Sequence, residues 1–203
     1  MERSVLIAIP AYNEEANIAS VIKKASNFGD VYVFNNNSDD QTKEISEENN
    51  ASILLVKDQG YENVIFAIVE FFLSSNFLKL VILDGDGEVG LDKINDGIEL
   101  LDEYDAVIGN RNSKKRLAER IVCFLFDYFY NIKDIYCGFK CFKKRGISAS
   151  RKQNTFATSI VQKDSKILNI PVKVNKRLSQ SKLGEGISIN MQLLSAGIKG
   201  LLS

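Results

Sequence analysis

The sequence predicts an α/β fold in which a mainly parallel sheet carries helices on both faces. Short apolar runs of strand length alternate along the chain with longer segments in which apolar residues recur every three or four positions. Strands and helices that alternate in this way form parallel sheets covered by helices. The chain has 203 residues, 45% of them hydrophobic, so it can bury the core of one globular domain.

The first strand is expected over Val5–Ile9, a compact apolar run that Pro10 closes. The next segment, 14–26, is expected to be a helix because its apolar residues share one face. These residues are Ile18, Val21, Ile22 and Ala25. A second strand is expected over 31–34, where the apolar spacing shortens again.

The second strand ends in the polar cluster Asn35–Ser38. Ser38 or Asp39 can cap a helix that runs to about Glu48, because a short oxygen-bearing side chain accepts hydrogen bonds from the first turn. A third strand is expected over 53–56, from a short apolar run.

The next helix is expected over 62–73, which is rich in apolar residues. A fourth strand, 80–83, stops at the acidic segment Asp84–Glu88. A helix over 91–101 and a strand over 106–108 complete the regular part of the chain.

The second half of the chain is less regular. Helices are expected over 116–130 and 155–168, and strands over 139–142 and 170–174. A last amphipathic stretch covers 187–202, which is too short and too broken by polar residues to span a bilayer. It can lie on a membrane interface or pack as an ordinary core helix.

Four polar clusters follow ends of the expected strands. They cover residues 10–14, 35–40, 84–88 and 109–111. Because the carboxyl ends of parallel strands meet at one edge of a sheet, where such folds bind ligands, the clusters are expected to converge on one site.

The composition excludes several kinds of site. Without a single His, the chain can hold neither a Ser-His-Asp nor a Cys-His centre, nor a histidine-ligated zinc. Three cysteines, Cys123, Cys137 and Cys141, are no disulfide framework and are expected to be reduced thiols. The 26 basic and 26 acidic residues balance, which argues against nucleic acid as a partner.

Neither a secretory signal nor a transmembrane helix is expected. The first apolar run is short and ends at Pro10. The longest later run, Ile121–Tyr130, is interrupted by Asp127 and is far shorter than a bilayer span. We therefore expect a cytoplasmic location, with peripheral attachment to the cytosolic membrane face as an option.

The acidic segment Asp84-Gly85-Asp86-Gly87-Glu88 is the most informative part of the sequence. Three carboxylates crowded after one strand are unfavourable unless a cation compensates them. Hard divalent cations prefer such oxygen ligands together with phosphates of a substrate, and the two glycines permit a tight turn. The alternative is a solvated acidic turn, but the position of this segment at the end of a strand favours a metal site.

Five motifs in order resemble the family 2 glycosyltransferases, whose Rossmann-like fold is called GT-A. Ile9–Glu15 resembles the opening signature, Asp84–Asp86 the Asp-x-Asp metal motif, and Val107–Arg111 the strand and arginine that follow. Asp134 with Gly138–Lys140, and Arg177 with Ser181–Gly184, resemble motifs of the polyprenyl-phosphate sugar transferases, which include dolichyl-phosphate mannose synthase. The resemblance implies one GT-A-like domain over 1–203, with a donor-binding half over 1–111 and an acceptor-side half over 112–203.

The resemblance also implies roles for single residues. Pro10, Tyr12 and Glu14 would line the nucleotide pocket, Asn36 stands where the family often has a base-reading aspartate, and Asp84 would lie near the ribose and diphosphate. The residues implied for metal are Asp86 and Glu88, with Mg²⁺ or Mn²⁺. Those implied for phosphate are Arg111, Arg177 and Lys182. The catalytic residues implied are Asp84, Asp86, Arg111 and Asp134.

The implied reaction is an inverting, metal-dependent transfer of a sugar from a UDP- or GDP-linked donor to a polyprenyl phosphate at a membrane surface, with a membrane-anchoring protein as a further partner. Such an acceptor is ionised near pH 7, so the reaction needs no strong base, and catalysis rests on positioning and charge stabilisation.

The sequence departs from the family at three places, and two alternatives stay open. Asn35–Asn37 replaces a carboxylate-bearing run, Gly60–Asn63 lacks a lysine, and Lys140 replaces an arginine. One alternative is the same fold with a saccharide or another small acceptor. The other is a degenerate, non-catalytic subunit that binds nucleotide sugar. The aromatic run 124–130 and the basic run Lys114–Arg116 can contact lipid, or can be ordinary core and a solvated turn.

Overall fold

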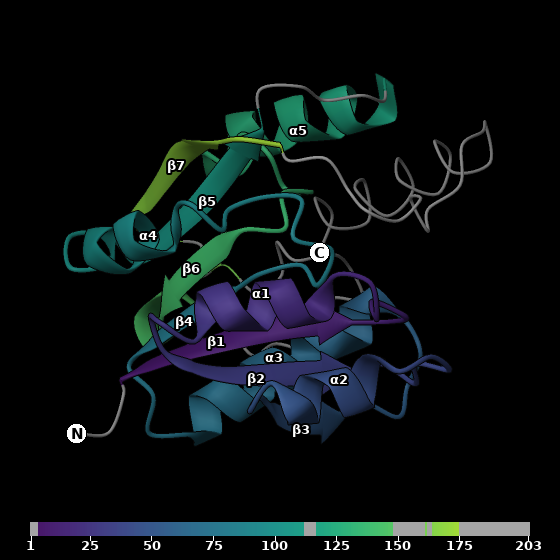
Figure 1. Ribbon diagram of the computed structural model, residues 1–203. Coiled ribbons are helices and arrows are strands. Elements are labelled where there is room, and N and C mark those ends of the chain that lie inside the picture. The colour runs from purple at the N-terminus through teal and green to yellow at the C-terminus, as the bar shows by residue number, and fades with distance from the viewer. Residues whose placement is uncertain (1–3, 112–116, 148–160, 162–163, 175–203) are drawn as a thin grey trace.

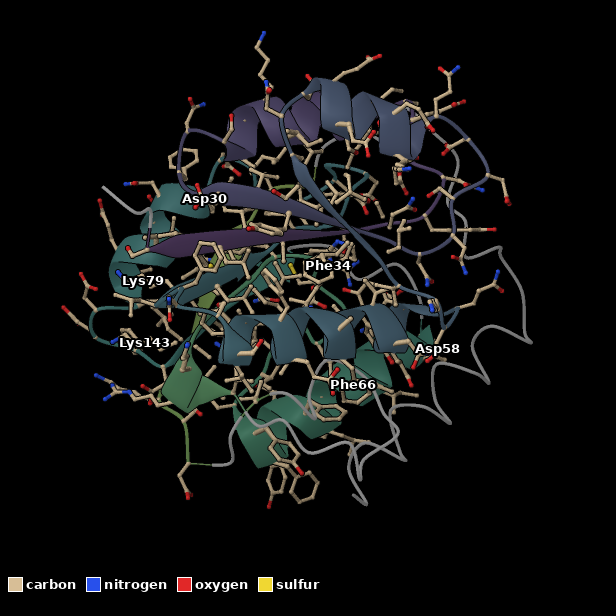
Figure 2. All side chains as sticks on the ribbon, turned by 90° about the horizontal axis from the view of Figure 1, so that it is seen from below. Asp30, Phe34, Asp58, Phe66, Lys79 and Lys143 are labelled. Carbon is tan, nitrogen blue, oxygen red and sulfur yellow. The ribbon has the colours of Figure 1, made fainter. Side chains whose placement is uncertain are left out.

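The computed structural model describes residues 4–111, 117–147, 161 and 164–174. These residues form a seven-stranded sheet with the strand order β3-β2-β1-β4-β6-β5-β7, covered by helices (Figure 1). The strands are β1 Val5–Ala11, β2 Asp30–Asn35, β3 Ser52–Leu55, β4 Lys79–Ile82, β5 Ala106–Arg111, β6 Lys140–Lys143 and β7 Ile167–Val172. The helices are α1 Ile18–Ala25, α2 Thr42–Glu48, α3 Tyr61–Ser74, α4 Ile94–Leu100 and α5 Leu117–Tyr130, with a 3₁₀ turn η1 at Lys144–Gly146.

The sheet is parallel except at β6. Strand β1 pairs in parallel with β2 and β4, β2 with β3, and β5 with β7. Strand β6 runs antiparallel between β4 and β5, where Lys140 pairs with both Ile82 and Ile108. The start of β6 therefore lies beside the ends of β4 and β5. The mainly parallel α/β sheet expected from the sequence is confirmed.

Two hydrophobic clusters hold the helices on the two faces of the sheet. Along β1, Val5, Ile7 and Ile9 join one cluster, while Leu6 and Ala8 join the other, as the two-residue period of a strand requires. The first cluster contains residues of α1 and α4, and the second contains residues of α3 and α5. Helices thus cover both faces, and the strand ends are left to form a ligand-binding edge.

The first two helices start later than the sequence indicated. Helix α1 begins at Ile18 instead of residue 14, and α2 begins at Thr42 instead of directly after a cap at Ser38 or Asp39. The reason is a set of hydrogen bonds between the two loops: the backbone N–H of Glu14 donates to Thr42 Oγ1 over 2.7 Å, and that of Glu15 to Asp40 Oδ2 over 3.1 Å. Of the two residues expected to cap α2, Ser38 instead accepts a hydrogen bond of 3.0 Å from the backbone N–H of Asn13 in the loop after β1.

The expected helix over 155–168 is wrong at its end. Ile167 and Leu168 belong to β7, whose Ile167 pairs with Ala106 and whose Val172 pairs with Arg111. Pairing with β7 also lengthens β5 beyond the expected 106–108. Most of the remainder of that expected helix, and the stretch 187–202, lie outside the described residues. Within the described parts of the chain, no helix has the length and apolar character needed to cross a bilayer.

Candidate active site

The polar loops after β1, β2 and β4 meet at one edge of the sheet. A Cβ atom added at Gly85 would lie 3.2 Å from Glu14 Cγ and 3.2 Å from the carbonyl oxygen of Pro10. The backbone N–H of Asn13 donates to Ser38 Oγ over 3.0 Å. The predicted convergence of the segments 10–14, 35–40 and 84–88 is therefore observed.

Tyr12 and Glu14 lie in the loop after β1, and Glu14 approaches the acidic turn at Gly85. The ring of Tyr12 is 44% exposed, so it offers an aromatic surface at the edge of the sheet. Glu14 Oε2 accepts a hydrogen bond from Asn17 Nδ2 over 3.2 Å. Between them, Asn13 has a φ of 54°, and its Oδ1 accepts a bond of 2.8 Å from the backbone of Asp39. These contacts fix the loop that carries the two predicted nucleotide-binding residues.

Asn36 holds a neighbouring loop through its side chain. The residue is buried, and its Nδ2 donates to the carbonyl oxygens of Val56 and Asp58 over 3.2 and 2.9 Å. Its Oδ1 accepts from the backbone N–H of Gly60 over 2.8 Å. An ionised aspartate accepts hydrogen bonds but donates none, so it would present a carboxylate to two carbonyl oxygens. The asparagine that departs from the family pattern therefore suits this loop.

The loop held by Asn36 positions Tyr61, a site residue that sequence reasoning missed. Gly60 has a φ of 117°, and Tyr61 follows as the first residue of α3. The Tyr61 hydroxyl donates to Asp84 Oδ1 over 3.3 Å. Burial of the hydroxyl and the nearby Asp84 carboxylate raise the pKa of Tyr61 well above its usual value of 10.0, so the group stays a neutral donor. The departure from the family motif at Gly60–Asn63 was the signal that could have found it.

Asp84 is confined on its other side by Gly138. A Cβ atom at position 138 would lie 2.1 Å from Asp84 Oδ2 and 2.4 Å from its Cγ. Only glycine allows the chain entering β6 to approach the carboxylate this closely. Tyr61 and Gly138, far apart in the sequence, therefore set the position of the first carboxylate of the acidic turn.

The rest of the acidic turn is held by its own backbone. The N–H of Gly87 donates to the carbonyl oxygen of Asp84 over 3.2 Å, and that of Glu88 to Asp86 Oδ1 over 2.9 Å. Gly87 takes a φ of 64°, which glycine adopts without strain. Asp86 and Glu88 are both half-buried. The turn therefore presents carboxylate oxygens from a tight, braced backbone.

This donor set fits a hard divalent cation that arrives with a phosphate ligand. Among the described residues, no group of three or more Asp, Glu or Cys side chains is already gathered as a metal cage. Magnesium needs no such cage, because it commonly takes one or two carboxylates and completes its shell with water and substrate phosphates. Asp86 and Glu88 stay the predicted ligands.

At the end of β5, the half-buried Arg111 forms an ion pair with the buried Asp134. Arg111 Nε donates to Asp134 Oδ2 over 2.8 Å, and Nη2 to Oδ1 over 3.0 Å. The Asp134 side chain is fully buried, and Glu119 Oε2 lies 3.6 Å from Arg111 Nη2. Burial lowers the pKa of Arg111, but the bonds and charges of Asp134 and Glu119 outweigh this and raise it above its usual value. The cation is thus oriented by a bidentate bond.

Lys140 carries a second buried cation near the two aspartates. It is 3% exposed, and its Nζ donates to the carbonyl oxygen of Cys137. Burial lowers the pKa of Lys140, while the charges of Asp84 and Asp134 oppose this. Burial also raises the pKa of the Cys137 thiol to about 11, so Cys137 is protonated and weakly nucleophilic at neutral pH. All three cysteines are buried and unbridged.

Two predicted phosphate-binding residues, Arg177 and Lys182, lie outside the described residues. The described part of the site therefore comprises the loops after β1, β2 and β4, the start of α3, the end of β5 and the segment 134–140. The residues that sequence reasoning named in it are Pro10, Tyr12, Glu14, Asn36, Asp84, Asp86, Glu88, Arg111 and Asp134. Sequence reasoning named neither Tyr61 nor Gly138 as a contact of Asp84, because both contacts join distant segments.

Comparison with known proteins places the chain in a family. Residues 6–122 match the family described as glycosyl transferase family 2. The glycosyltransferase AglJ of Haloferax volcanii is 28% identical over 158 residues, covering 70% of this chain and 50% of that protein. Protein RfbJ of Shigella flexneri is 30% identical over 113 residues, covering 53% of this chain and 85% of RfbJ. The chain thus spans about half the length of AglJ.

Solved structures share the fold at low identity. Glucosyl-3-phosphoglycerate synthase from Mycobacterium tuberculosis, in complex with Mn²⁺, UDP and glucosyl-3-phosphoglycerate, superposes with a TM-score of 0.74. The match covers 96% of this chain and 78% of that chain at 14% identity. A complex of the same enzyme with Mn²⁺, UDP-glucose and phosphoglyceric acid also gives 0.74, at 15% identity. The sheet is that of the GT-A fold, and with more than half of its length matched, the chain belongs to glycosyl transferase family 2.

Proposed function

We propose that this chain transfers a sugar from a nucleotide sugar to an acceptor phosphate, with a polyprenyl phosphate as the acceptor. The observation that carries the proposal is the meeting of the acidic turn with the Arg111–Asp134 pair at the entry to β6. Gly138 contacts Asp84, and Asp134, four residues before it, binds Arg111. One short segment thus links a carboxylate for the donor side to a cation for the acceptor side.

On the donor side, a nucleoside diphosphate is the leaving group. A divalent ion held by Asp86 and Glu88 would neutralise the charge that develops on it. Tyr12 offers its exposed ring to the base, and Asp84, held by Tyr61 and Gly138, is positioned for the ribose and diphosphate. The mycobacterial enzyme of the same fold binds Mn²⁺ with UDP and with UDP-glucose, which supports a UDP-sugar as the first donor to test.

On the acceptor side, the nucleophile is an oxygen of a phosphate group that is already ionised. The chain then needs to orient the acceptor and balance its charge, and Arg111 is the oriented cation at this edge. No histidine is required, which agrees with a sequence that has none. Direct displacement at the sugar carbon would invert its configuration.

A small phosphorylated acceptor is the second candidate. The mycobacterial complexes contain phosphoglyceric acid as well as UDP-glucose, and the same Arg111 chemistry suits either phosphate. The polyprenyl acceptor is favoured by Asp134 with Gly138–Lys140, which resembles the motif of the polyprenyl-phosphate sugar transferases.

A transfer assay tests the proposal. Radiolabelled UDP- and GDP-sugars are incubated with Mn²⁺ and either polyprenyl phosphate in detergent or phosphoglycerate, and label is measured in the organic and aqueous products. We expect label in the organic product, lost on chelation and in Asp86→Ala. The matched control, Glu103→Ala, removes an exposed carboxylate elsewhere and should keep activity. Transfer to phosphoglycerate alone would select the second candidate, and transfer to neither acceptor would contradict the proposal.

A further inference from the structure

Helix α5 is apolar on two opposite faces. Its inner face contributes Ala118, Val122, Cys123 and Phe126 to the core. On the other side, large apolar residues recur at spacings of four, three and four, which places them in one stripe at about 100° per residue. The α5 outer face comprises Leu117, Ile121, Phe124 and Tyr128, together with the exposed Phe129, whose ring centroid lies 5.0 Å from that of Tyr128.

The α5 outer face is exposed to an unusual degree. Phe124 is 71% exposed, Tyr128 77%, Phe129 62% and Leu117 68%. Half of the ten large apolar side chains that the described residues expose lie on this helix. Single exposed apolar residues are normal, but a contiguous exposed patch marks an interaction surface.

The inner face of α5 is tied to the acceptor side of the site. Glu119 Oε2 lies 3.6 Å from Arg111 Nη2, and Cys123 Sγ lies 3.8 Å from Asp134 Oδ1. Figure 1 shows α5 at the end of the molecule opposite β3, next to β5. Whatever binds the α5 outer face therefore lies one helix diameter away from Arg111, about 10 Å.

In the sequence, basic residues outnumber acidic ones from Lys114 to Lys133, the stretch that contains α5. Lys114, Lys115 and Arg116 precede the helix directly in the sequence. Arg120 on the helix and Lys133 after it are exposed, as is one acidic residue, Asp127. Phe and Tyr side chains beside basic residues are typical of helices that lie at the interface of an anionic bilayer.

We propose that the α5 outer face binds the surface of an anionic lipid bilayer. Phe124, Tyr128 and Phe129 enter the headgroup region, and the exposed Arg120 and Lys133 contact lipid phosphates. This orientation holds Arg111 near the depth at which a membrane-embedded polyprenyl phosphate presents its phosphate. The inference rests on the proposed function for the identity of that acceptor, but the surface itself is argued from exposure and charge.

Vesicle flotation tests whether the α5 outer face binds anionic membranes. The probes are vesicles of phosphatidylcholine alone and of phosphatidylcholine with phosphatidylglycerol in equal parts. The variant is Phe124→Ser with Tyr128→Ser, and the matched control is Leu55→Ser with Leu78→Ser, whose leucines are each 64% exposed on other elements. We expect wild type and control to float with anionic vesicles, the variant to bind at least about tenfold more weakly, and high salt to weaken binding.

Nucleotide binding measured on the same samples separates this inference from the proposed function. In one outcome, wild type binds Mn²⁺ and nucleotide without floating on anionic vesicles; in another, it floats no better than the variant. Either result would contradict the proposed membrane-binding surface without contradicting the proposed function. Light scattering adds a further outcome: a wild-type dimer that the variant converts to monomer would show a second copy on the α5 outer face, which also overturns the proposal. Vesicle binding without nucleotide binding would uphold the surface and contradict the function.

Discussion

Two aspartates of the site, Asp84 on the donor side and Asp134 on the acceptor side, are held in contrasting ways. Asp84, at the end of β4, accepts a hydrogen bond from the neutral hydroxyl of Tyr61. Asp134 is fully buried and accepts three bonds from Arg111, two from the side chain and one from the backbone. The contrast is one of direct contacts: Arg111 binds Asp134 through a bidentate bond, whereas the Tyr61 hydroxyl and the close approach of Gly138 position Asp84.

The largest expected effect on stability follows from breaking the acceptor-side pair. Asp134→Ala removes a fully buried carboxylate and leaves the half-buried Arg111 guanidinium without its bidentate partner, so the free energy of unfolding should fall by about 3–5 kcal/mol. Urea denaturation measures the change. The control is Asp102→Ala, which removes the exposed partner of Lys79 and should change the free energy of unfolding far less. Equal costs would contradict the contrast between buried and exposed pairs.

The next effect concerns the close contact of Gly138 with Asp84. Gly138→Ala places a methyl group 2.1 Å from Asp84 Oδ2, so the carboxylate must move and metal-dependent nucleotide affinity should fall at least about tenfold.

A double-mutant cycle tests the cause of the Gly138→Ala effect. In an Asp84→Ala background the colliding carboxylate is gone, so Gly138→Ala should destabilise the protein less than it does in wild type. The free energy of unfolding of all four proteins is compared. An identical cost in both backgrounds would show that the methyl group meets something other than Asp84.

Asn36→Asp should have a smaller effect. It removes two side-chain donors from the carbonyl oxygens of Val56 and Asp58 and introduces a buried carboxylate, so unfolding should become easier by about 1–3 kcal/mol. Thermal denaturation measures the change against Asn37→Asp, which loses one exposed bond to Lys57. No difference between the two variants would show that the loop does not depend on Asn36.

The smallest expected effect is a pH dependence from Tyr61. Its pKa is raised in the folded state by burial and by Asp84, so its contribution to stability is present below pH 10 and is lost as pH rises above it. Tyr61→Phe should therefore lose stability less steeply than wild type between pH 9 and roughly pH 11.

The control for the Tyr61 experiment is Tyr128→Phe, since Tyr128 is 77% exposed. Its urea midpoints should follow those of wild type across the alkaline range. Parallel curves for wild type and Tyr61→Phe would show that the bond to Asp84 does not shift the titration of the phenol.

Local patterns made most of the fold and part of the site predictable. The buried runs that became β1, β2 and β4, and the acidic turn after β4, follow from hydrophobic periodicity and from the glycines around Asp86. The antiparallel insertion of β6 could not be predicted, because it depends on pairing with two distant strands. The contacts of Asn36 and Tyr61 were missed for the same reason, and residues 167–168 were assigned to a helix because their pairing with β5 is invisible in a local window.

The central claim is that the turn Asp84–Glu88 binds a nucleotide sugar through a divalent ion. Calorimetric titration of UDP- and GDP-sugars into wild type, Asp86→Ala and the control Glu103→Ala, each with and without Mn²⁺, tests it most directly. We predict binding of one nucleotide in wild type and control only when Mn²⁺ is present, and its loss in Asp86→Ala. Equal binding with and without Mn²⁺, or unchanged binding in Asp86→Ala, would contradict the claim.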